Sequence, residues 1–137
     1  MCVLKKQIGG NHYKKLNYQP AELFAKLNCN AFQANIIKYT VRGSVRRSIV
    51  DYKKCKHYAE LAQALLVDRG SILEKNNSSV YDYYIIKRFC LANTIPEVGC
   101  KIIDYAMSHN YDLVIDVCND LLQWPKWAIE ERIKRKI

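Results

Sequence analysis

Residues 34–43 read Ala-Asn-Ile-Ile-Lys-Tyr-Thr-Val-Arg-Gly. At helical spacing, Asn35, Lys38 and Arg42 share one face, Tyr39 lies beside it, and the isoleucines and the valine cover other faces. An amide, an ammonium and a guanidinium are thereby brought to one side of a predicted helix. Such a face is suited to holding a phosphate, because both cations donate charge-assisted hydrogen bonds to anionic oxygens.

Residues 51–58 read Asp-Tyr-Lys-Lys-Cys-Lys-His-Tyr. Asp51, Lys54 and Tyr58 repeat the spacing of the first segment, so two helices with matching polar stripes predict a shared site. Each residue also has a structural explanation. Asp51 could cap a helix, Asn35 could be a packing amide, and the tyrosines could belong to the core.

Periodic apolar residues predict helices over residues 20–27, 31–41, 81–91, 97–107, 111–122 and from 125 onward, and a further helix that begins at Ser48 or Asp51 and ends near residue 68. Gly43 and Ser44 are expected to stop the second helix, and Thr94 with Glu97 resembles a capping box for the helix that follows. No internal repeat and no strand pattern is apparent. The prediction is an all-α fold, a compact helical bundle with a C-terminal helical subdomain.

Two regions are expected in this bundle. Residues 1–72 form a basic helical ligand-binding region, beginning with a polar arm over residues 1–18. Residues 81–137 form the C-terminal subdomain, and the polar stretch 74–80 separates the two. Aromatic residues crowd the start of the second region, and Trp124 and Trp127 flank a proline near its end. This apolar surface predicts packing against the core and formation of a homo-oligomer.

The charge is unevenly placed along the chain. The net charge is +9, and the first 67 residues carry twelve lysines and arginines against three acidic residues. The remainder is balanced, so the whole excess lies where the polar stripes are. An anionic ligand is the economical explanation.

The sequence also excludes several classes of protein. Six cysteines without a Cys-x-x-Cys pair indicate free thiols and a reducing cytoplasm, and no segment is apolar enough for a signal peptide or a membrane span. A phosphate loop of the Gly-x-x-x-x-Gly-Lys type is missing. Helical nucleoside triphosphate pyrophosphatases need clustered carboxylates, which the first half lacks.

The order of the motifs carries a family resemblance. His12-Tyr13 is followed by Asn-x-x-Lys-Tyr-x-x-Arg over residues 35–42 and by Asp-x-x-Lys-x-x-x-Tyr over residues 51–58. This order resembles the small phage-encoded nucleotide kinase family, also described as the SaV-like domain of unknown function, over roughly residues 8–66. The resemblance implies a phage or prophage protein that binds nucleotides, with deoxynucleoside monophosphate kinase as the family's best-known activity.

Residue pattern and resemblance together predict the ligand contacts. They are His12, Tyr13, Asn35, Lys38, Tyr39, Arg42, Arg46, Arg47, Asp51, Lys54 and Tyr58. Without a phosphate loop, phosphoryl transfer would depend on these cations and on Mg²⁺ carried by the nucleotide phosphates, with no metal site in the protein. Two alternatives stay open: a non-catalytic protein that sequesters nucleotides or cyclic nucleotides, and nucleic-acid binding through the basic half.

Overall fold

The computed structural model describes residues 16–67 and 81–123. Its α-helices are α1 (Pro20–Leu27), α2 (Ala31–Arg46), α3 (Ile49–Ala62), α5 (Tyr83–Ala92), α6 (Glu97–Met107) and α7 (Tyr111–Gln123), and a π-helical turn over Gln63–Val67 extends α3. No strand occurs in these ranges. The predicted all-α fold is confirmed.

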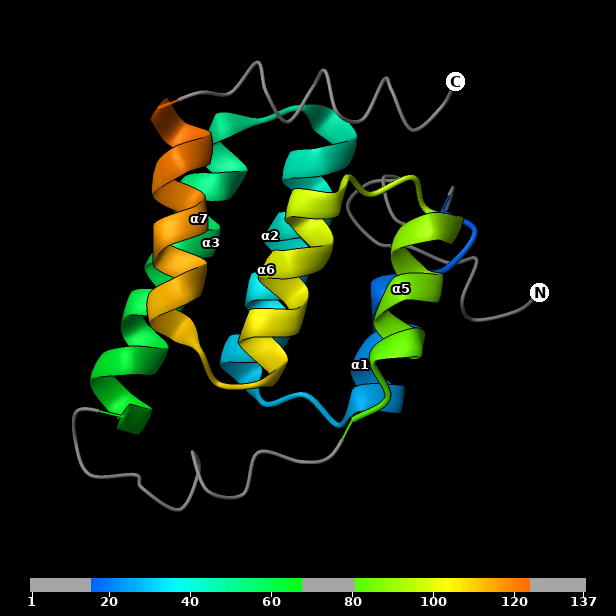
Figure 1. Ribbon diagram of the computed structural model, residues 1–137, viewed down its shortest axis with the longest axis horizontal. Coiled ribbons are helices and arrows are strands. Elements are labelled where there is room, and N and C mark those ends of the chain that lie inside the picture. Colours follow the sequence, from blue (N-terminus) through cyan, green and yellow to red (C-terminus); the bar gives the residue numbers. More distant parts are fainter. Residues whose placement is uncertain (1–15, 68–80, 124–137) are drawn as a thin grey trace.

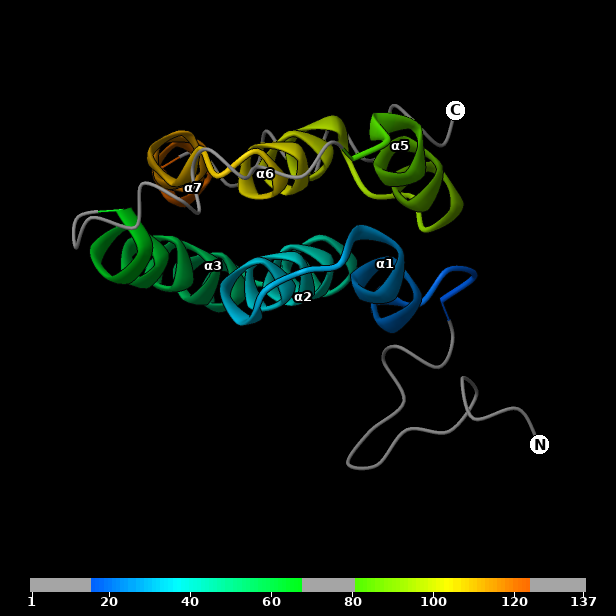
Figure 2. The same ribbon diagram turned by 90° about the horizontal axis from the view of Figure 1, so that it is seen from below.

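The helices form two layers of three (Figures 1 and 2). Helices α1, α2 and α3 lie side by side in one layer, and α5, α6 and α7 lie in the other, in the same order. Across the layers α1 contacts α5, α2 contacts α6 and α3 contacts α7. The colours of Figure 1 show that the two helices of each facing pair run in opposite directions.

The core between the layers consists of two clusters of buried residues. Ile36 of α2 and Ile102 of α6 belong to the first cluster, which α3 and α7 complete. Ile37 and Ile103, the next residue in each helix, belong to the second, which α1 and α5 complete. All four isoleucine side chains are inaccessible to solvent. Each cluster draws on both layers, so the core is formed between the halves of the chain.

Most helix starts have a polar residue that satisfies free backbone donors. Asn30 and Gln33 cap α2 reciprocally, with hydrogen bonds of 2.8 and 2.9 Å, and of the two expected starts of α3, Ser48 is the cap. The predicted capping box at Thr94 is wrong. Thr94 has a left-handed φ of 55° and lies in the turn that closes α5, where the Ile95 N–H donates to the Cys90 carbonyl at 2.8 Å. Pro96 occupies the N-cap of α6.

The predicted stop at Gly43 and Ser44 is also wrong. Helix α2 continues to Arg46 and ends at Arg47, whose φ is 56°. Gly43 does not end the helix but leaves room for a neighbouring side chain, because a Cβ at this position would lie 2.9 Å from Cε2 of Tyr52. The next residue fixes the same ring, since the Ser44 hydroxyl and the Tyr52 hydroxyl lie 2.9 Å apart in a hydrogen bond. Gly43 thus lets α3 approach α2 closely.

Gly43→Ala is expected to destabilise the protein despite alanine's better helix propensity. The propensity gain is about 1 kcal/mol, whereas overpacking a buried contact costs typically about 1–3 kcal/mol. The Tyr52 ring cannot tilt away freely, because it is buried and hydrogen-bonded. Chemical denaturation should therefore show a net loss of about 1 kcal/mol, the difference between these two terms. A gain in stability would mean that the ring yields and that helix propensity dominates.

Other expectations fall on residues outside the described ranges. These are the N-terminal arm with His12 and Tyr13, the linker over residues 74–80 and the helix from residue 125. Within the described ranges, no helix combines the length and apolarity needed to cross a membrane.

Candidate functional site

Three cationic side chains surround the ring of Tyr39. The Nζ atoms of Lys38 and Lys54 lie 4.5 and 5.3 Å from the ring centroid, and the guanidinium carbon of Arg42 lies 5.6 Å from it. Lys38 and Arg42 come from α2, as Tyr39 does, whereas Lys54 reaches the ring from α3. We call these four residues, with Asp51 and Tyr58, the Tyr39 cluster.

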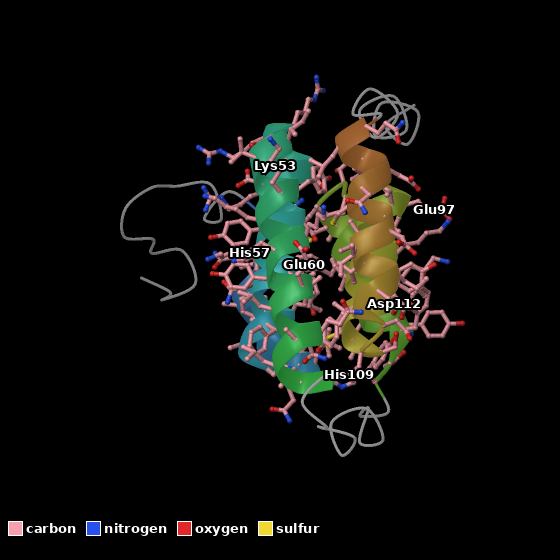
Figure 3. All side chains as sticks on the ribbon, turned by 90° about the vertical axis from the view of Figure 1, so that its left-hand side faces the viewer. Lys53, His57, Glu60, Glu97, His109 and Asp112 are labelled. Carbon is pink, nitrogen blue, oxygen red and sulfur yellow. The ribbon has the colours of Figure 1, made fainter. Side chains whose placement is uncertain are left out.

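The aromatic part of the cluster is a stacked pair. The rings of Tyr39 and Tyr58 have centroids 5.7 Å apart and planes inclined by 15°. His57 lies next to this pair, with its ring centroid 6.1 Å from that of Tyr58 at 61°. Both tyrosines are half-buried and His57 is exposed; Figure 3 labels His57 between Lys53 and Glu60 along α3. A flat aromatic surface therefore adjoins the three cations.

One carboxylate enters the cluster. Asp51 Oδ1 lies 3.8 Å from Nε of Arg42, an ion pair too long for a hydrogen bond. The Arg42 Nε is buried and has no hydrogen-bond partner among the described residues. Of the two side chains, 23% of Arg42 is exposed but 5% of Asp51. The arginine is thus accessible from solvent, whereas the carboxylate is held inside.

The charges of the cluster do not cancel. Three cations share one carboxylate, which leaves an excess of two positive charges. A cation–π contact contributes roughly 0.5–1 kcal/mol at an exposed site, which offsets part of the repulsion between the like charges. The cluster still offers two unneutralised charges to an anion.

The packing of α2 on α3 fixes these side chains. Behind the Tyr39 cluster, the Cys55 thiol lies 3.4 Å from the Thr40 hydroxyl and 3.7 Å from the Ile36 carbonyl oxygen. Thr40 also donates to the Ile36 carbonyl at 2.7 Å. These contacts are fully buried, so the polar stripes of the two helices face outward in a fixed register.

The structure brings together Lys38, Tyr39, Arg42, Asp51, Lys54 and Tyr58 of the predicted site residues. Asn35 instead donates its amide to the Ala31 carbonyl of its own helix at 2.8 Å. Arg46 and Arg47 are exposed at the end of α2 and form no hydrogen bond, ion pair or cation–π contact with the cluster. His12 and Tyr13 lie outside the described residues. His57, which precedes Tyr58 in the chain, is not among the predicted site residues, although its ring lies beside that of Tyr58.

Asp51 also lies at the start of a helix, which is part of the structural role considered for it. It occupies the first turn of α3, and its backbone N–H donates to the Ser48 hydroxyl at 3.4 Å. Its carboxylate there lies near the positive end of the helix dipole, which stabilises the negative charge. The capping side chain itself is that of Ser48, so Asp51 is free to pair with Arg42.

Tyr81, which precedes α5, and Asp104 of α6 form a second polar group. The Tyr81 hydroxyl donates to Asp104 Oδ1 at 2.5 Å and to the Asp104 carbonyl oxygen at 3.1 Å. Burial, followed by the hydrogen bond with Asp104, raises the pKa of Tyr81 to about 12. A tyrosine of this pKa stays protonated at neutral pH, so it donates to Asp104 and carries no charge.

The cysteines do not provide a nucleophile among the described residues. Burial raises the pKa of Cys29 to about 11, and a hydrogen bond with Cys55 together with burial raises the pKa of Cys118 well above its usual range. The reactive species of a cysteine is the thiolate, which such pKa values suppress. Cys55, Cys90 and Cys100 are buried and form no disulfide bond.

Neither metal chemistry nor known relatives add to this description. Residues 16–67 and 81–123 contain no group of three or more His, Cys, Asp or Glu side chains that could hold a metal ion. Comparison of the chain with protein-family models, with curated proteins and with solved structures found no match.

Proposed function

We propose that the protein binds a nucleotide at the Tyr39 cluster. The observation that supports this most strongly is the gathering of Lys38, Arg42 and Lys54 around one ring with a single carboxylate to balance them. A phosphate group carries up to two negative charges at neutral pH and accepts several hydrogen bonds. It matches both the excess charge and the donors of the cluster.

The aromatic surface favours a nucleotide over a simple inorganic anion. Stacking of a base on an aromatic side chain is worth about 1–3 kcal/mol and is tolerant of base identity. Tyr58 and the exposed ring of His57 adjoin the cations, so one ligand can place its phosphate on the cations and its base on the rings. The resemblance of the motif order to phage nucleotide kinases supports the same ligand.

Binding and turnover are separate questions for this site. In a deoxynucleoside monophosphate kinase, the cations would stabilise the charge of the transferred phosphoryl group, and Mg²⁺ would arrive with the nucleotide phosphates. In a sequestering protein, the same side chains would hold a nucleotide or cyclic nucleotide unchanged. Incubation with nucleotides and Mg²⁺, followed by chromatography of the nucleotides, separates the two.

A thermal-shift screen tests nucleotide binding directly. A ligand at 100 times its Kd stabilises the native state by about 2.7 kcal/mol, which raises the melting temperature by several degrees. Nucleoside mono-, di- and triphosphates and cyclic dinucleotides are the test set, and the unphosphorylated nucleosides are the control. We expect stabilisation by at least one phosphorylated compound and none by the nucleosides. Equal melting temperatures throughout would contradict the proposal.

Nucleic-acid binding is the second candidate, favoured by the exposed Arg46, Arg47 and Lys53 around the corner between α2 and α3. Contacts with several backbone phosphates would make the affinity fall steeply with salt. Fluorescence polarisation with a labelled oligonucleotide at two salt concentrations distinguishes this candidate, because mononucleotides should not compete.

A further inference from the structure

The two layers of the molecule are related by an approximate two-fold axis. From left to right, Figure 2 shows α3, α2 and α1 in one layer and α7, α6 and α5 in the facing layer, and each facing pair is antiparallel (Figure 1). A two-fold axis that lies between the layers and runs perpendicular to the helices produces this arrangement. We call the two groups of helices the first unit and the second unit.

The units agree in detail along their first two helices. Asn28 and Thr94 are both left-handed, with φ of 52° and 55°, and each lies three residues before the start of the next helix. Ile36 and Ile102 are separated along the chain by the same number of residues as Asn28 and Thr94, and so are Ile37 and Ile103. Each isoleucine pair is fully buried and belongs to one cluster. Tyr39 corresponds to Tyr105, and both tyrosines pack at the edge of the first cluster.

The third helices agree as well. Apart from Asp51, their buried residues have identical spacing, as Tyr52, Cys55, Ala59 and Ala62 in α3 and Tyr111, Val114, Cys118 and Leu121 in α7. Arg47 and His109, both left-handed, each lie two residues before the helix begins, so residues 49–51 of α3 have no counterpart in α7. With the buried tyrosines Tyr52 and Tyr111 aligned, Tyr58 corresponds to Val117, which also packs at the edge of the first cluster.

The three cations of the Tyr39 cluster have no counterparts in the second unit. The position of Lys38 is taken by Asp104, that of Arg42 by Ser108 and that of Lys54 by Leu113. Asp104 is moreover engaged by the Tyr81 hydroxyl. The position that corresponds to the proposed site therefore lacks the three cations that would hold a phosphate.

We infer that the chain consists of two structurally equivalent three-helix units, and that the second unit retains the scaffold of a phosphate-ligand site at Tyr105 without its cations. This rests on the proposed function of the first unit. It has two consequences. Each chain binds one phosphorylated ligand, although it contains two units, and restoring the cations at Asp104, Ser108 and Leu113 creates a second site.

Isothermal titration with inorganic pyrophosphate tests both consequences. The wild type should bind one pyrophosphate per chain, and Arg42→Ala should weaken this binding at least tenfold. Adding Asp104→Lys, Ser108→Arg and Leu113→Lys to Arg42→Ala should restore one site, with an affinity within about tenfold of the wild type. Circular dichroism verifies that each variant is folded. If the triple substitution unfolds the protein, Asp104→Asn replaces Asp104→Lys, because the amide can still accept from Tyr81.

A charge-matched control makes the same total change in charge at three other positions, all on α7. It combines Arg42→Ala with Asp112→Lys, Asn119→Arg and Gln123→Lys, which are exposed positions, and should not restore binding. Two sites in the wild type, a folded triple variant without binding, or equal binding by the control would each overturn the inference but leave the first site standing. A wild type that binds neither pyrophosphate nor any nucleotide overturns the proposed function and the inference together.

Discussion

Arg42→Ala is expected to weaken nucleotide binding by about 1.5–3 kcal/mol, the usual scale for a hydrogen bond to a charged group. This corresponds to roughly a ten- to 150-fold increase in Kd. Arg42 adjoins the Tyr39 ring, and part of its side chain is accessible to solvent. Loss of the guanidinium also leaves Asp51 without its ion-pair partner, which increases the repulsion of a phosphate. Calorimetry with the best nucleotide from the screen measures the change.

Two further variants identify the cause of the loss. Arg88→Ala removes an exposed arginine of α5 and changes the net charge equally, so it should leave Kd nearly unchanged. Arg42→Lys keeps the charge but loses the planar fork of donors, and should recover part of the affinity. Equal affinities for the wild type and Arg42→Ala, or equal losses for Arg42→Ala and Arg88→Ala, would mean that the ligand binds elsewhere or responds to net charge alone.

Ile102→Ala is expected to lower the free energy of unfolding by about 2–5 kcal/mol, the range for truncating a buried isoleucine. The Ile102 side chain is inaccessible to solvent and packs in a cluster that includes Ile36, Tyr52 and Tyr111. These residues belong to both layers, so the cavity should destabilise both halves of the chain at once. Urea denaturation followed by circular dichroism should show one transition at a lower midpoint.

The control for this prediction is Leu91→Ala on α5. Leu91 keeps 65% of its surface exposed, and a surface substitution of this kind changes stability by about 0.5 kcal/mol or less. If Ile102→Ala instead split the unfolding into two transitions, with one unchanged, the layers would be independent and the shared core would be refuted.

Helix positions could be predicted from the sequence because local pattern decides them. Periodic apolar residues indicated every described helix, and α1, α2, α6 and α7 begin at the predicted residues. The end of α2 and the cap of α6 depend on tertiary contacts that a pattern does not contain. Gly43 accommodates the Tyr52 ring, and Thr94 adopts a left-handed turn that positions the buried Ile95. In the sequence alone, Gly43 resembles a residue that ends a helix and Thr94 resembles a residue that caps one.

The candidate site could be predicted in part for the same reason. Helical spacing is a local property, so the common face of Lys38 and Arg42 was readable, and the pairing of two short helices with matching stripes suggested Lys54. The stacking of Tyr39 on Tyr58 depends on the register between α2 and α3, which the sequence does not contain. Ligand binding by the predicted site residues, phosphoryl transfer and homo-oligomerisation remain predictions.

The internal two-fold relation could not be predicted from the sequence. Over residues 20–41, aligned with 86–107, the identical pairs are Ile36 with Ile102, Ile37 with Ile103 and Tyr39 with Tyr105. Burial and backbone conformation are preserved between the units, but chemical identity is not. A core requires volume and apolarity at a position, and many side chains satisfy that requirement.

Binding at the Tyr39 cluster is tested most directly by nuclear magnetic resonance of the labelled protein during titration with the nucleotide that stabilises it best. We expect the largest shifts of backbone amide signals in residues 35–42 of α2 and 51–58 of α3, with small shifts in α5 and α6. Largest shifts in α5 and α6, with residues 35–42 and 51–58 unchanged, would contradict the assignment of the site.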